Sequence, residues 1–578
     1  MRDGDHGGRK MMKRWDLSRQ AAQRTRIGVL AILISACAAC SPGGAQSDIA
    51  ESEQAPAVAA APEPSVAPAP EPDTTSNIYT LERVKPDTEL ASGESDTQTE
   101  TLPAPVFGLP ELRDLARRRA TEPYQPSRAL PEPAKRLNYD QYRRIIPKQD
   151  DMSGEERPGQ VRVLFDPRGY LFDHEVKINL IDGETVSPLP YDASLFDFKD
   201  LDLPNAVTES LGFAGLKLLQ PLNEAGKFDE VLSFKGASFF RALGAGSVYG
   251  ASARGLSIGT ASSEGEEFPA FREFWIRRPS GPAGDTFVFA LMDSPSLTGA
   301  FQFRVAAGPT TRMDVEASFY ARKKVAQVGL SPLTSMYYFS PHDVTKRGDD
   351  YRPAVHDSEG LAIHMANGEW VWRPLQNPAA LEVSVLAGRQ PNGFGLVQRH
   401  RKFEHYSDLE ADYHQRPDVW VEPKGDWGGG QLMLVEIPTS NEYNDNIAVF
   451  WRPEQALMPG AAFTVSYTMN WGLKPGVVAD VATVAETRAG QKPGDKNQIF
   501  VLDYKGAPAE HFRNAEIEVS TSAGRIINPV LQPHPDGDTQ RLSFELDAEG
   551  AAMAELRAVL TKGGQPITET WLYRWSAK

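Results

Sequence analysis

Residues 161–183 read VRVLFDPRGYLFDHEVKINLIDG, and this stretch points to the fold class most directly. Apolar side chains alternate over 161–165 and again over 174–180, and a turn follows each run, at Asp166–Gly169 and at Asp182–Gly183. Period-two alternation that ends in a turn is typical of half-buried β-strands. The stretch therefore predicts two strands with a short connection.

The same alternation returns near the C-terminus. It covers Leu542, Phe544 and Leu546, and then Trp571, Tyr573 and Trp575. Turns that contain glycine punctuate the chain at Asn392-Gly393, Asp536-Gly537 and Glu549-Gly550. Only two short segments, 109–119 and 141–146, are candidates for helices. Many short strands with frequent turns and few helices predict an all-β protein.

The 578 residues divide into four parts by composition. Residues 1–40 are basic and then apolar, and residues 41–104 are rich in Pro, Ala and acids. A turn-rich stretch over 471–495 separates the remainder into 105–475 and 476–578. The first of these is long enough for a large multi-stranded β-sandwich, and the second for a small antiparallel one.

The first 40 residues have the order of a secretion signal. Eight Lys and Arg side chains precede the ten-residue apolar run Ile27–Ala36, which is too short to span a bilayer. The segment Ile34-Ser35-Ala36-Cys37 resembles a bacterial lipobox, in which the cysteine is lipidated once the preceding peptide is removed. The alternative is an ordinary signal cleaved near residues 39–43. Both interpretations predict export to the periplasm, and the first makes Cys37 the lipidation site.

Composition excludes several classes of protein. No cysteine follows Cys40, so the folded part has no disulfide framework, no thiolate nucleophile and no Cys-based metal site. The formal charge of −16 without a basic patch argues against nucleic-acid binding. Residues 41–104 hold nine prolines, twelve acids and two bases, a composition that predicts a disordered tether.

Three motifs that reveal catalysis or nucleotide binding from sequence alone are missing. The chain has no GxGxxG after a strand, no GxxxxGK[ST] and no HExxH. His400, His405 and His414 share one charged stretch, but their spacing is not that of a helical ligand pair. We therefore predict no metal site and no cofactor.

Loop sequences between residues 330 and 452 are rich in aromatic, acidic and amide side chains. Four stretches show this, at 335–339, 367–373, 420–427 and 439–446. Aromatic rings can cover the C–H face of a sugar while carboxylates and amides bind its hydroxyls, so the pattern predicts a carbohydrate groove. The alternative is core packing, because Trp370 and Trp372 alternate on a predicted strand. For any single tryptophan, core packing is the stronger interpretation.

Several ordered segments resemble one known family. They are YGASARGLS (249–257), GEEFPAFREFW (265–275), LMDSP (291–295), SPLTSM (331–336), VHDSEGL (355–361), GFGL (393–396) and VEIPT (435–439). Over residues 105–578 the chain is similar to the OpgG/OpgD (MdoG/MdoD) family of periplasmic glucan biosynthesis proteins. The resemblance implies a large galactose-mutarotase-like β-sandwich followed by a small immunoglobulin-like β-sandwich. It also implies a role in making osmoregulated periplasmic glucans, whose backbone is β-1,2-linked glucose, as an inverting endo-β-1,2-glucanase.

The resemblance assigns the catalytic residues as well. Asp357, in a His-Asp-Ser segment, matches the general base, and Asp445, in an Asn-Asp-Asn-Ile segment, matches the general acid. Glu442 matches a further acidic site residue. Without the resemblance, Asp357 and Asp445 would be interpreted as turn residues.

An inverting glycosidase needs two carboxyl groups about 6.5–9.5 Å apart, with room for a water. One of them has to stay protonated near neutral pH, so its pKa has to rise well above the ~3.9 of a free Asp. Burial against aromatic rings and a nearby carboxylate both have that effect. Asp357 and Asp445 are 88 residues apart, so the sequence does not reveal whether they meet. The resemblance implies a proton relay through waters, which allows a wider separation.

Six further residues are substrate-binding candidates: Tyr351, Arg352, Trp370, Arg399, Arg401 and Trp451. Two classes of function stay open. One is a hydrolase that acts on β-1,2-glucan after a membrane glucan glycosyltransferase extrudes it. The other is a non-catalytic glucan-binding or glycosyltransferase-coupling protein, and a sugar epimerase is a third, weaker interpretation. An OpgG-like or OpgD-like role and the oligomeric state, a homodimer included, also stay open.

Overall fold

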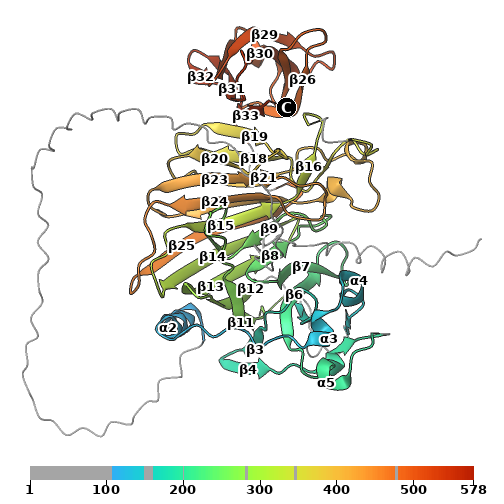
Figure 1. Cartoon of the computed structure of the whole chain (residues 1–578), viewed down its shortest axis with the longest axis vertical. Helices are drawn as coiled ribbons and strands as arrows, with labels where there is room; N and C mark the ends of the chain where they lie inside the picture. Colours follow the sequence, from blue (N-terminus) through green and yellow to red (C-terminus); the bar gives the residue numbers. More distant parts are fainter. Residues whose placement is uncertain are drawn as a thin grey trace, which may run out of the picture. The chain divides into compact units, whose positions relative to one another are not determined.

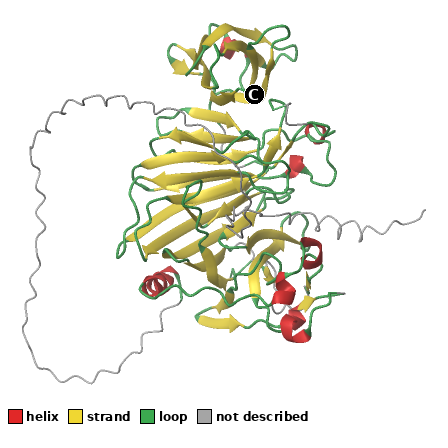
Figure 2. Ribbon diagram, viewed as in Figure 1, coloured by secondary structure: helices red, strands yellow, loops and turns green. Residues whose placement is uncertain are grey.

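The structure is a computed structural model that describes residues 107–148, 161–199, 201–279, 281, 284–343, 348–474 and 479–577. Strands dominate these residues and helices are few and short (Figure 1, Figure 2), which confirms the all-β prediction. The predicted signal with Cys37 and the predicted tether lie outside the described residues. No helix of the described part is both long and apolar enough to cross a membrane.

One sheet of the large sandwich has ten strands. Nine of them pair in the order β2-β6-β7-β8-β9-β15-β24-β23-β20, and β10 pairs with β15. Their bounds are β2 (Arg162–Pro167), β6 (Phe213–Pro221), β7 (Phe228–Lys235), β8 (Phe239–Ala242), β9 (Ser252–Arg254), β10 (Leu256–Ile258), β15 (Val328–Ser335), β20 (Glu382–Ala387), β23 (Gly430–Glu436) and β24 (Ile447–Pro453).

The facing sheet has fifteen strands. Fourteen pair in the order β28-β31-β33-β19-β18-β21-β22-β25-β14-β13-β12-β11-β3-β4, and β32 pairs with β31. Their bounds are β3 (Lys177–Asp182), β4 (Thr185–Leu189), β11 (Ala270–Arg277), β12 (Thr286–Asp293), β13 (Leu297–Ala306), β14 (Thr310–Ala321), β18 (Gly360–His364), β19 (Trp370–Pro374), β21 (Gly393–Val397), β22 (Asp418–Lys424), β25 (Ala462–Gly472), β28 (Glu516–Thr521), β31 (Met553–Lys562), β32 (Gln565–Pro566) and β33 (Thr570–Ser576).

The remaining strands form three smaller sheets. They are β1 (Ile146–Pro147) with β5 (Phe196–Asp197), β16 (Tyr337–Phe339) with β17 (Val355–His356), and the four-stranded sheet of β26 (Thr483–Gln491), β27 (Gln498–Lys505), β30 (Gln540–Asp547) and β29 (Arg525–Pro533). The helices are α2 (Leu109–Ala120), α3 (Glu132–Lys135), α4 (Tyr139–Tyr142) and α5 (Asn205–Thr208). Short 3₁₀ turns are η1 (Ala193–Leu195), η2 (Phe403–His405), η3 (Tyr413–Gln415) and η4 (Ala509–Phe512).

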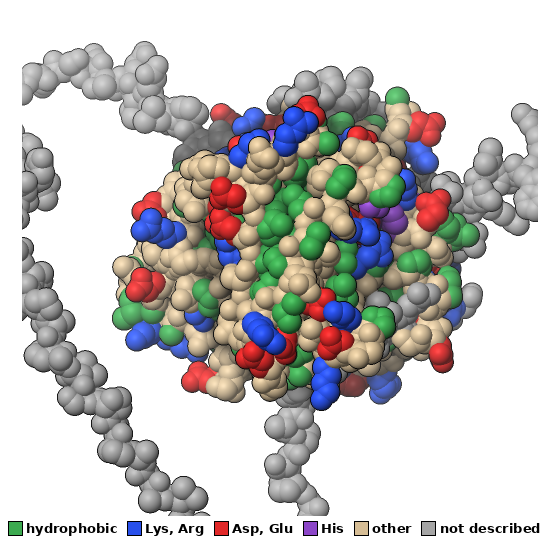
Figure 3. Space-filling view, turned by 90° about the horizontal axis from the view of Figure 1, so that it is seen from above, with side chains coloured by type: hydrophobic (Ala, Val, Ile, Leu, Met, Phe, Trp, Pro, Cys, Tyr) green, Lys and Arg blue, Asp and Glu red, His purple; other side chains and the backbone are tan. Residues whose placement is uncertain are grey.

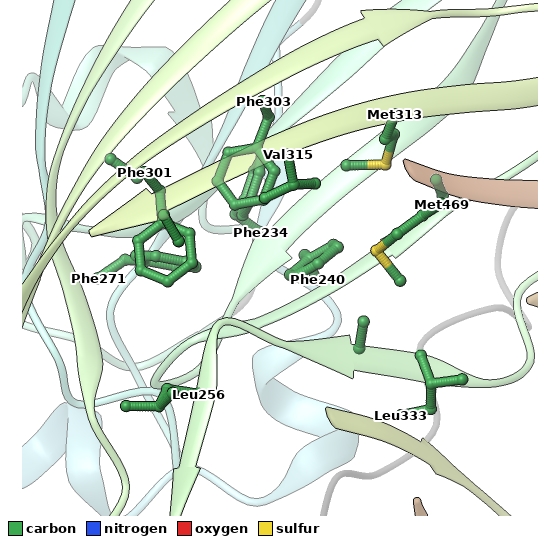
Figure 4. Close-up of a cluster of buried hydrophobic side chains, with 14 of the residues drawn as sticks. Phe234, Phe240, Leu256, Phe271, Phe301, Phe303, Met313, Val315, Leu333 and Met469 are labelled. Carbon is green, nitrogen blue, oxygen red and sulfur yellow. The ribbon is translucent and has the colours of Figure 1, made fainter. Parts of the chain in front are cut away.

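The main core lies between the two large sheets. Aromatic and aliphatic side chains from β7, β8 and β15 meet those from β11, β13, β14 and β25 (Figure 4). The ring centroids of Phe234 and Phe303, which come from opposite sheets, are 5.1 Å apart. Edge-to-face pairs of this kind add to the stabilisation from apolar burial, which holds two sheets face to face.

The predicted helix at 109–119 is confirmed as α2. Glu111 accepts a hydrogen bond from the Gly108 N–H (2.9 Å), and three arginines complement the last turn. Leu112 and Ala116 are fully buried against strands β12–β14 of the large sheet. The helix therefore covers part of the sheet face that points away from the main core.

The alternating runs also form strands as predicted. Leu542, Phe544 and Leu546 are fully buried on β30, and Trp571 and Tyr573 are buried on β33. The turns at Gly537 and Gly550 have positive φ, which glycine adopts without strain.

Two local predictions are wrong. The helix expected at 141–146 is the single turn α4, because Asn138 caps it from Tyr139 onward and Ile146 pairs with β5 instead. The turn expected at Asn392-Gly393 does not include Gly393, which begins strand β21. A Cβ at Gly393 would lie 2.4 Å from the Trp420 ring, so close packing explains this glycine.

The C-terminal strands bury a core of their own. Phe500, Leu502, Leu542, Phe544 and Trp571 belong to it, and Trp370, Trp372 and Trp420 of the preceding part pack into the same cluster. Strand β33 also pairs in parallel with β19. A division into domains at 475/476 remains a prediction, because one sheet runs through both parts and residues 475–478 lie outside the described residues.

Seen from the end drawn uppermost in Figure 1, the molecule shows one mixed face (Figure 3). Acidic and basic side chains are interspersed there around a strip of hydrophobic ones. Such a face carries no extended field of one sign to attract a charged ligand.

Candidate functional site

Asp357 and Asp445 lie on two loops that are fixed to the same segment of backbone. Asp357 lies in the connection between β17 and β18, and its N–H donates to the Met336 carbonyl (2.8 Å). Asp445 lies two residues before β24, and the side chain of the intervening Asn446 accepts a hydrogen bond from the N–H of Tyr337 (2.8 Å). Because both loops bond to residues 336–337, the fold brings the neighbourhoods of the two aspartates together.

Asp357 is buried, and its pKa is raised to about 6, with burial as the main cause. The negative charges of Asp445 and Glu442 contribute to this rise, whereas Arg416, through an ion pair of 2.7 Å, and Arg241 oppose it. The three acids interact although they come from separate positions in the sequence. We call Asp357, Glu442 and Asp445 the carboxylate cluster.

Glu442 is held by Arg352. The guanidinium of Arg352 forms ion pairs with Glu442 (2.6 Å), Asp350 (2.7 Å) and Asp408 (2.9 Å). The bond to Asp350 contributes most to raising the pKa of Arg352, so this side chain stays charged. One cation thus joins three loops beside the carboxylate cluster.

Asp445 has its contacts on the ten-stranded sheet. The hydroxyl of Thr334 donates to its Oδ2 atom (2.9 Å). Its charge also acts on Arg254, a buried guanidinium that pairs with Glu266 (2.6 Å) and lies over the ring of Phe239. Burial is the main cause that lowers the pKa of Arg254. A hydroxyl and a cation therefore flank this carboxylate.

Of the six substrate-binding candidates, Arg352 lies in the carboxylate cluster's immediate surroundings, and Tyr351 precedes it as a well-exposed side chain. Trp451 is fully buried in the main core, and Trp370 stacks on His364 and Trp420. Both placements favour core packing, the alternative that the sequence left open.

Arg399 and Arg401 have structural partners. Arg399 pairs with Glu569 (2.6 Å), lies over the ring of Trp372, and donates to the carbonyl of Val484. Arg401 pairs with the buried Asp418 (2.5 Å). These contacts attach residues 399–401 to neighbouring strands. None of them links either guanidinium to the carboxylate cluster.

Sequence reasoning missed several side chains that interact with the carboxylate cluster, among them Arg416, Arg241, Thr334, Arg254 and Tyr413. Thr334 and Arg254 lie in two of the segments that resembled the family, so a signal existed for them. Arg416 and Tyr413 come from an irregular stretch around η3, where no local pattern indicates which side chain reaches a distant aspartate. Among the described residues, no group of His, Cys, Asp or Glu is arranged to hold a metal ion.

His400 links the loop of Asp357 to the C-terminal strands. Its two ring nitrogens contact Glu359 (2.9 Å) and Glu486 on β26 (2.7 Å). Burial opposes the charged imidazolium, but the two glutamates prevail and raise the pKa of His400 to about 10. The backbone N–H groups of Arg399 and His400 also donate to Glu359, which is two residues from Asp357.

Replacing His400 with Ala is expected to lower the free energy of unfolding by about 3 kcal/mol at pH 7, because the buried Glu359 and the half-buried Glu486 lose their shared cation. Because the pKa of His400 is higher in the folded state than the unfolded value of 6.5, the charged imidazolium stabilises the fold fully below pH 6.5. This stabilisation is lost as pH rises toward 10. In denaturant titrations, the free energy of unfolding of the variant should therefore be much lower than that of the wild type at pH 7 and only slightly lower at pH 10. The matched control is His414→Ala, and an equal deficit in both variants or at both pH values would contradict the bridge.

Comparison with known proteins gives the family. A family model described as periplasmic glucan biosynthesis protein, MdoG, matches residues 107–575. The chain belongs to the MdoG family. Relatives named glucans biosynthesis protein G are 44% identical over 469 residues in Vibrio cholerae (80% of this chain, 85% of the relative) and 42% over 468 residues in Shewanella frigidimarina (80% and 83%). A relative of the same name from Bradyrhizobium diazoefficiens is 40% identical over 487 residues (83% and 95%).

The MdoG family's name indicates a periplasmic protein with a role in glucan biosynthesis. Among solved structures, a galactose mutarotase related enzyme from Lactobacillus acidophilus is similar to this chain, with 12% identity and a TM-score of 0.15. That similarity covers 32% of this chain and 70% of the enzyme, and it is too low to support an argument about fold or activity.

Proposed function

We propose that this MdoG-family protein is an inverting endo-β-1,2-glucanase that acts on the β-1,2-glucan backbone during periplasmic glucan biosynthesis. Asp445 is the general acid that protonates the departing glycosidic oxygen. Asp357 is the general base that activates water on the opposite face of the sugar, and Glu442 is the third acidic residue of the site.

The interaction of Asp357 with Asp445 and Glu442, across 88 and 85 residues, is the observation that supports this proposal best. An inverting glycosidase needs two carboxyl groups that lie on either side of one glycosidic bond, so the two acids have to belong to the same site. A pKa of about 6 suits a base that works near neutral pH, because the group is ionised there yet more basic than an ordinary Asp.

The stereochemistry of the product tests the inverting mechanism. Hydrolysis of linear β-1,2-glucan should release α-configured reducing ends first, and mutarotation should then equilibrate them. Proton NMR of the anomeric signals in the first minutes distinguishes the two outcomes. Reducing ends that appear first as the β-anomer would overturn inversion.

The pKa of Asp357 also predicts the acid limb of the pH profile. A base has to be ionised, so kcat/KM should fall about tenfold per pH unit below pH 6 and level off above it. Initial rates between pH 4.5 and pH 8 measure this directly. A rate that stays constant down to pH 4.5 would contradict Asp357 as the base.

The alternative is a non-catalytic protein that binds glucan or couples the membrane glucan glycosyltransferase to later steps. Glucan binding without release of reducing ends would favour it. The export signal over 1–40, lipidation of Cys37 and a tether over 41–104 belong to the same proposal, and they would hold the glucanase close to a membrane from which glucan emerges.

A further inference from the structure

The ten-stranded sheet has a second, smaller apolar cluster on the face that points away from the main core. Neighbouring strands β15, β24, β23 and β20 form this part of the sheet (Figure 1). On β24, Val449 and Trp451 belong to the main core, whereas Ala448 and Phe450 pack with Met433 and Val435 of β23 in a separate cluster. Alternate residues of a strand point to opposite faces, so this cluster lies outside the sandwich.

A hollow of about 260 Å³ opens over that cluster. Its apolar lining comes from Met433, Val435, Phe450 and Val383. Its polar lining consists of hydroxyls from Ser257, Thr260, Ser262 and Ser263, the amide of Gln327 and the guanidinium of Arg452. An apolar surface with a rim of hydroxyl, amide and guanidinium groups matches the two kinds of surface that a sugar ring presents.

One polar atom of the hollow lacks a partner. Ser257 is 2% exposed, and its Oγ has no hydrogen bond within the described residues. Gly329 faces it across the β10–β15 pair, and a Cβ at Gly329 would lie 2.2 Å from this Oγ and 2.7 Å from the ring of Phe450. A buried hydroxyl without a hydrogen-bond partner is unfavourable. Glycine at 329 thus leaves room for the Ser257 hydroxyl beside the hollow.

The hollow lies on the same sheet face as the contact of Asp445. Thr334, which donates to Asp445, pairs with Ala448. Paired residues share a face, and Phe450 follows Ala448 by two residues, or about 7 Å along the strand. The loop after β10 gives a second connection, because Thr260 and Arg254 both bond to Glu266 and Arg254 interacts with Asp445.

From this placement we infer that the hollow binds one pyranose ring of a glucan chain whose linkage is cleaved at the carboxylate cluster. The inference rests on the proposed function and adds a distal sugar site to it. The volume is below the ~300–1,000 Å³ that accommodates drug-sized ligands, which fits a single ring rather than an oligosaccharide. Glucans long enough to reach the hollow gain its contacts, and the shortest cleaved oligosaccharides do not.

Substitution of Val383 or Val385 by tryptophan tests the distal sugar site. Both residues are exposed on β20, but only Val383 lines the hollow. In the full-length protein, Val383→Trp should fill it and raise KM for long linear β-1,2-glucan about tenfold, which corresponds to ~1.4 kcal/mol. It should leave kcat/KM for the shortest cleaved oligosaccharide unchanged. Val385→Trp is the matched control and should behave as the wild type with both substrates.

Arg452→Ala gives a second variant that removes a rim contact without adding bulk, and it should also raise KM for the long substrate alone. Calorimetric titration with the same glucan separates this inference from the proposed function. If the wild type binds glucan without cleaving it, the glucanase proposal is overturned but the distal site is not. The distal site is then supported by a loss of glucan affinity in Val383→Trp. Equal affinities for Val383→Trp and Val385→Trp, or equal losses with long and short substrates, would overturn the distal site.

Discussion

Replacing Asp445 with Asn is expected to lower kcat for β-1,2-glucan hydrolysis by about three orders of magnitude while glucan affinity changes less than twofold. General acid catalysis contributes about 10²–10⁴-fold, and an amide has no proton of suitable acidity to give to the departing oxygen. Asn keeps the shape of Asp and an oxygen that can accept from the Thr334 hydroxyl, so the loop before β24 should stay in place.

The measurement is a time course of reducing ends, together with calorimetric titration of the same glucan. Asp426→Asn is the matched control. It also removes one negative charge, but from an exposed turn, where the Asp426 carboxylate accepts a hydrogen bond from the Gly428 N–H of its own loop. Wild-type activity in Asp445→Asn would remove Asp445 from the mechanism. Equal losses in the two variants would point to net charge rather than to proton donation.

Replacing Asp357 with Asn is expected to abolish hydrolysis to a similar extent and, at the same time, to stabilise the fold at neutral pH. The pKa of Asp357 rises from 3.8 to about 6 on folding, chiefly because the carboxyl is buried. A raised carboxyl pKa costs nothing below pH 3.8, where both states are protonated, and the cost grows until pH exceeds 6. Each pKa unit corresponds to 1.36 kcal/mol, so removal of the charge should add about 1–3 kcal/mol at pH 7.5.

Denaturant titrations of the two proteins at pH 7.5 and pH 4 measure this difference. The gain should be present at pH 7.5 and nearly absent at pH 4. Arg416 can still donate to the amide oxygen of the variant, so its contact is preserved in part. A variant that is less stable than the wild type at pH 7.5 would show that the Arg416 ion pair outweighs burial, contrary to the raised pKa.

Local patterns in the sequence predicted the strands that have one buried and one exposed face. They failed where packing between segments distant in the sequence determines the local structure. Leu542, Phe544 and Leu546 alternate and are fully buried on one side of β30. Asn392-Gly393 has the composition of a hairpin turn, but the glycine is there because the Trp420 ring occupies the place of a side chain. No pattern within a few residues could reveal that contact, since Trp420 lies on a different strand.

The carboxylate cluster shows the same limit. Asp357, Glu442 and Asp445 were identified by resemblance, and their interaction depends on hydrogen bonds from two loops to residues 336–337. Arg416 reaches Asp357 from an irregular segment, so a basic residue there looks like any surface arginine. Trp451 illustrates the opposite error, because an aromatic residue near acidic loops resembles a sugar platform even when its ring lies in the core.

The glucanase activity is tested most directly when the purified full-length protein is incubated with linear β-1,2-glucan and new reducing ends and product sizes are followed. We predict a steady release of oligosaccharides by the wild type and none above background by Asp445→Asn. Absence of release by the wild type, with glucan binding still measurable by calorimetry, would contradict the glucanase and assign the protein a binding or coupling role in glucan biosynthesis.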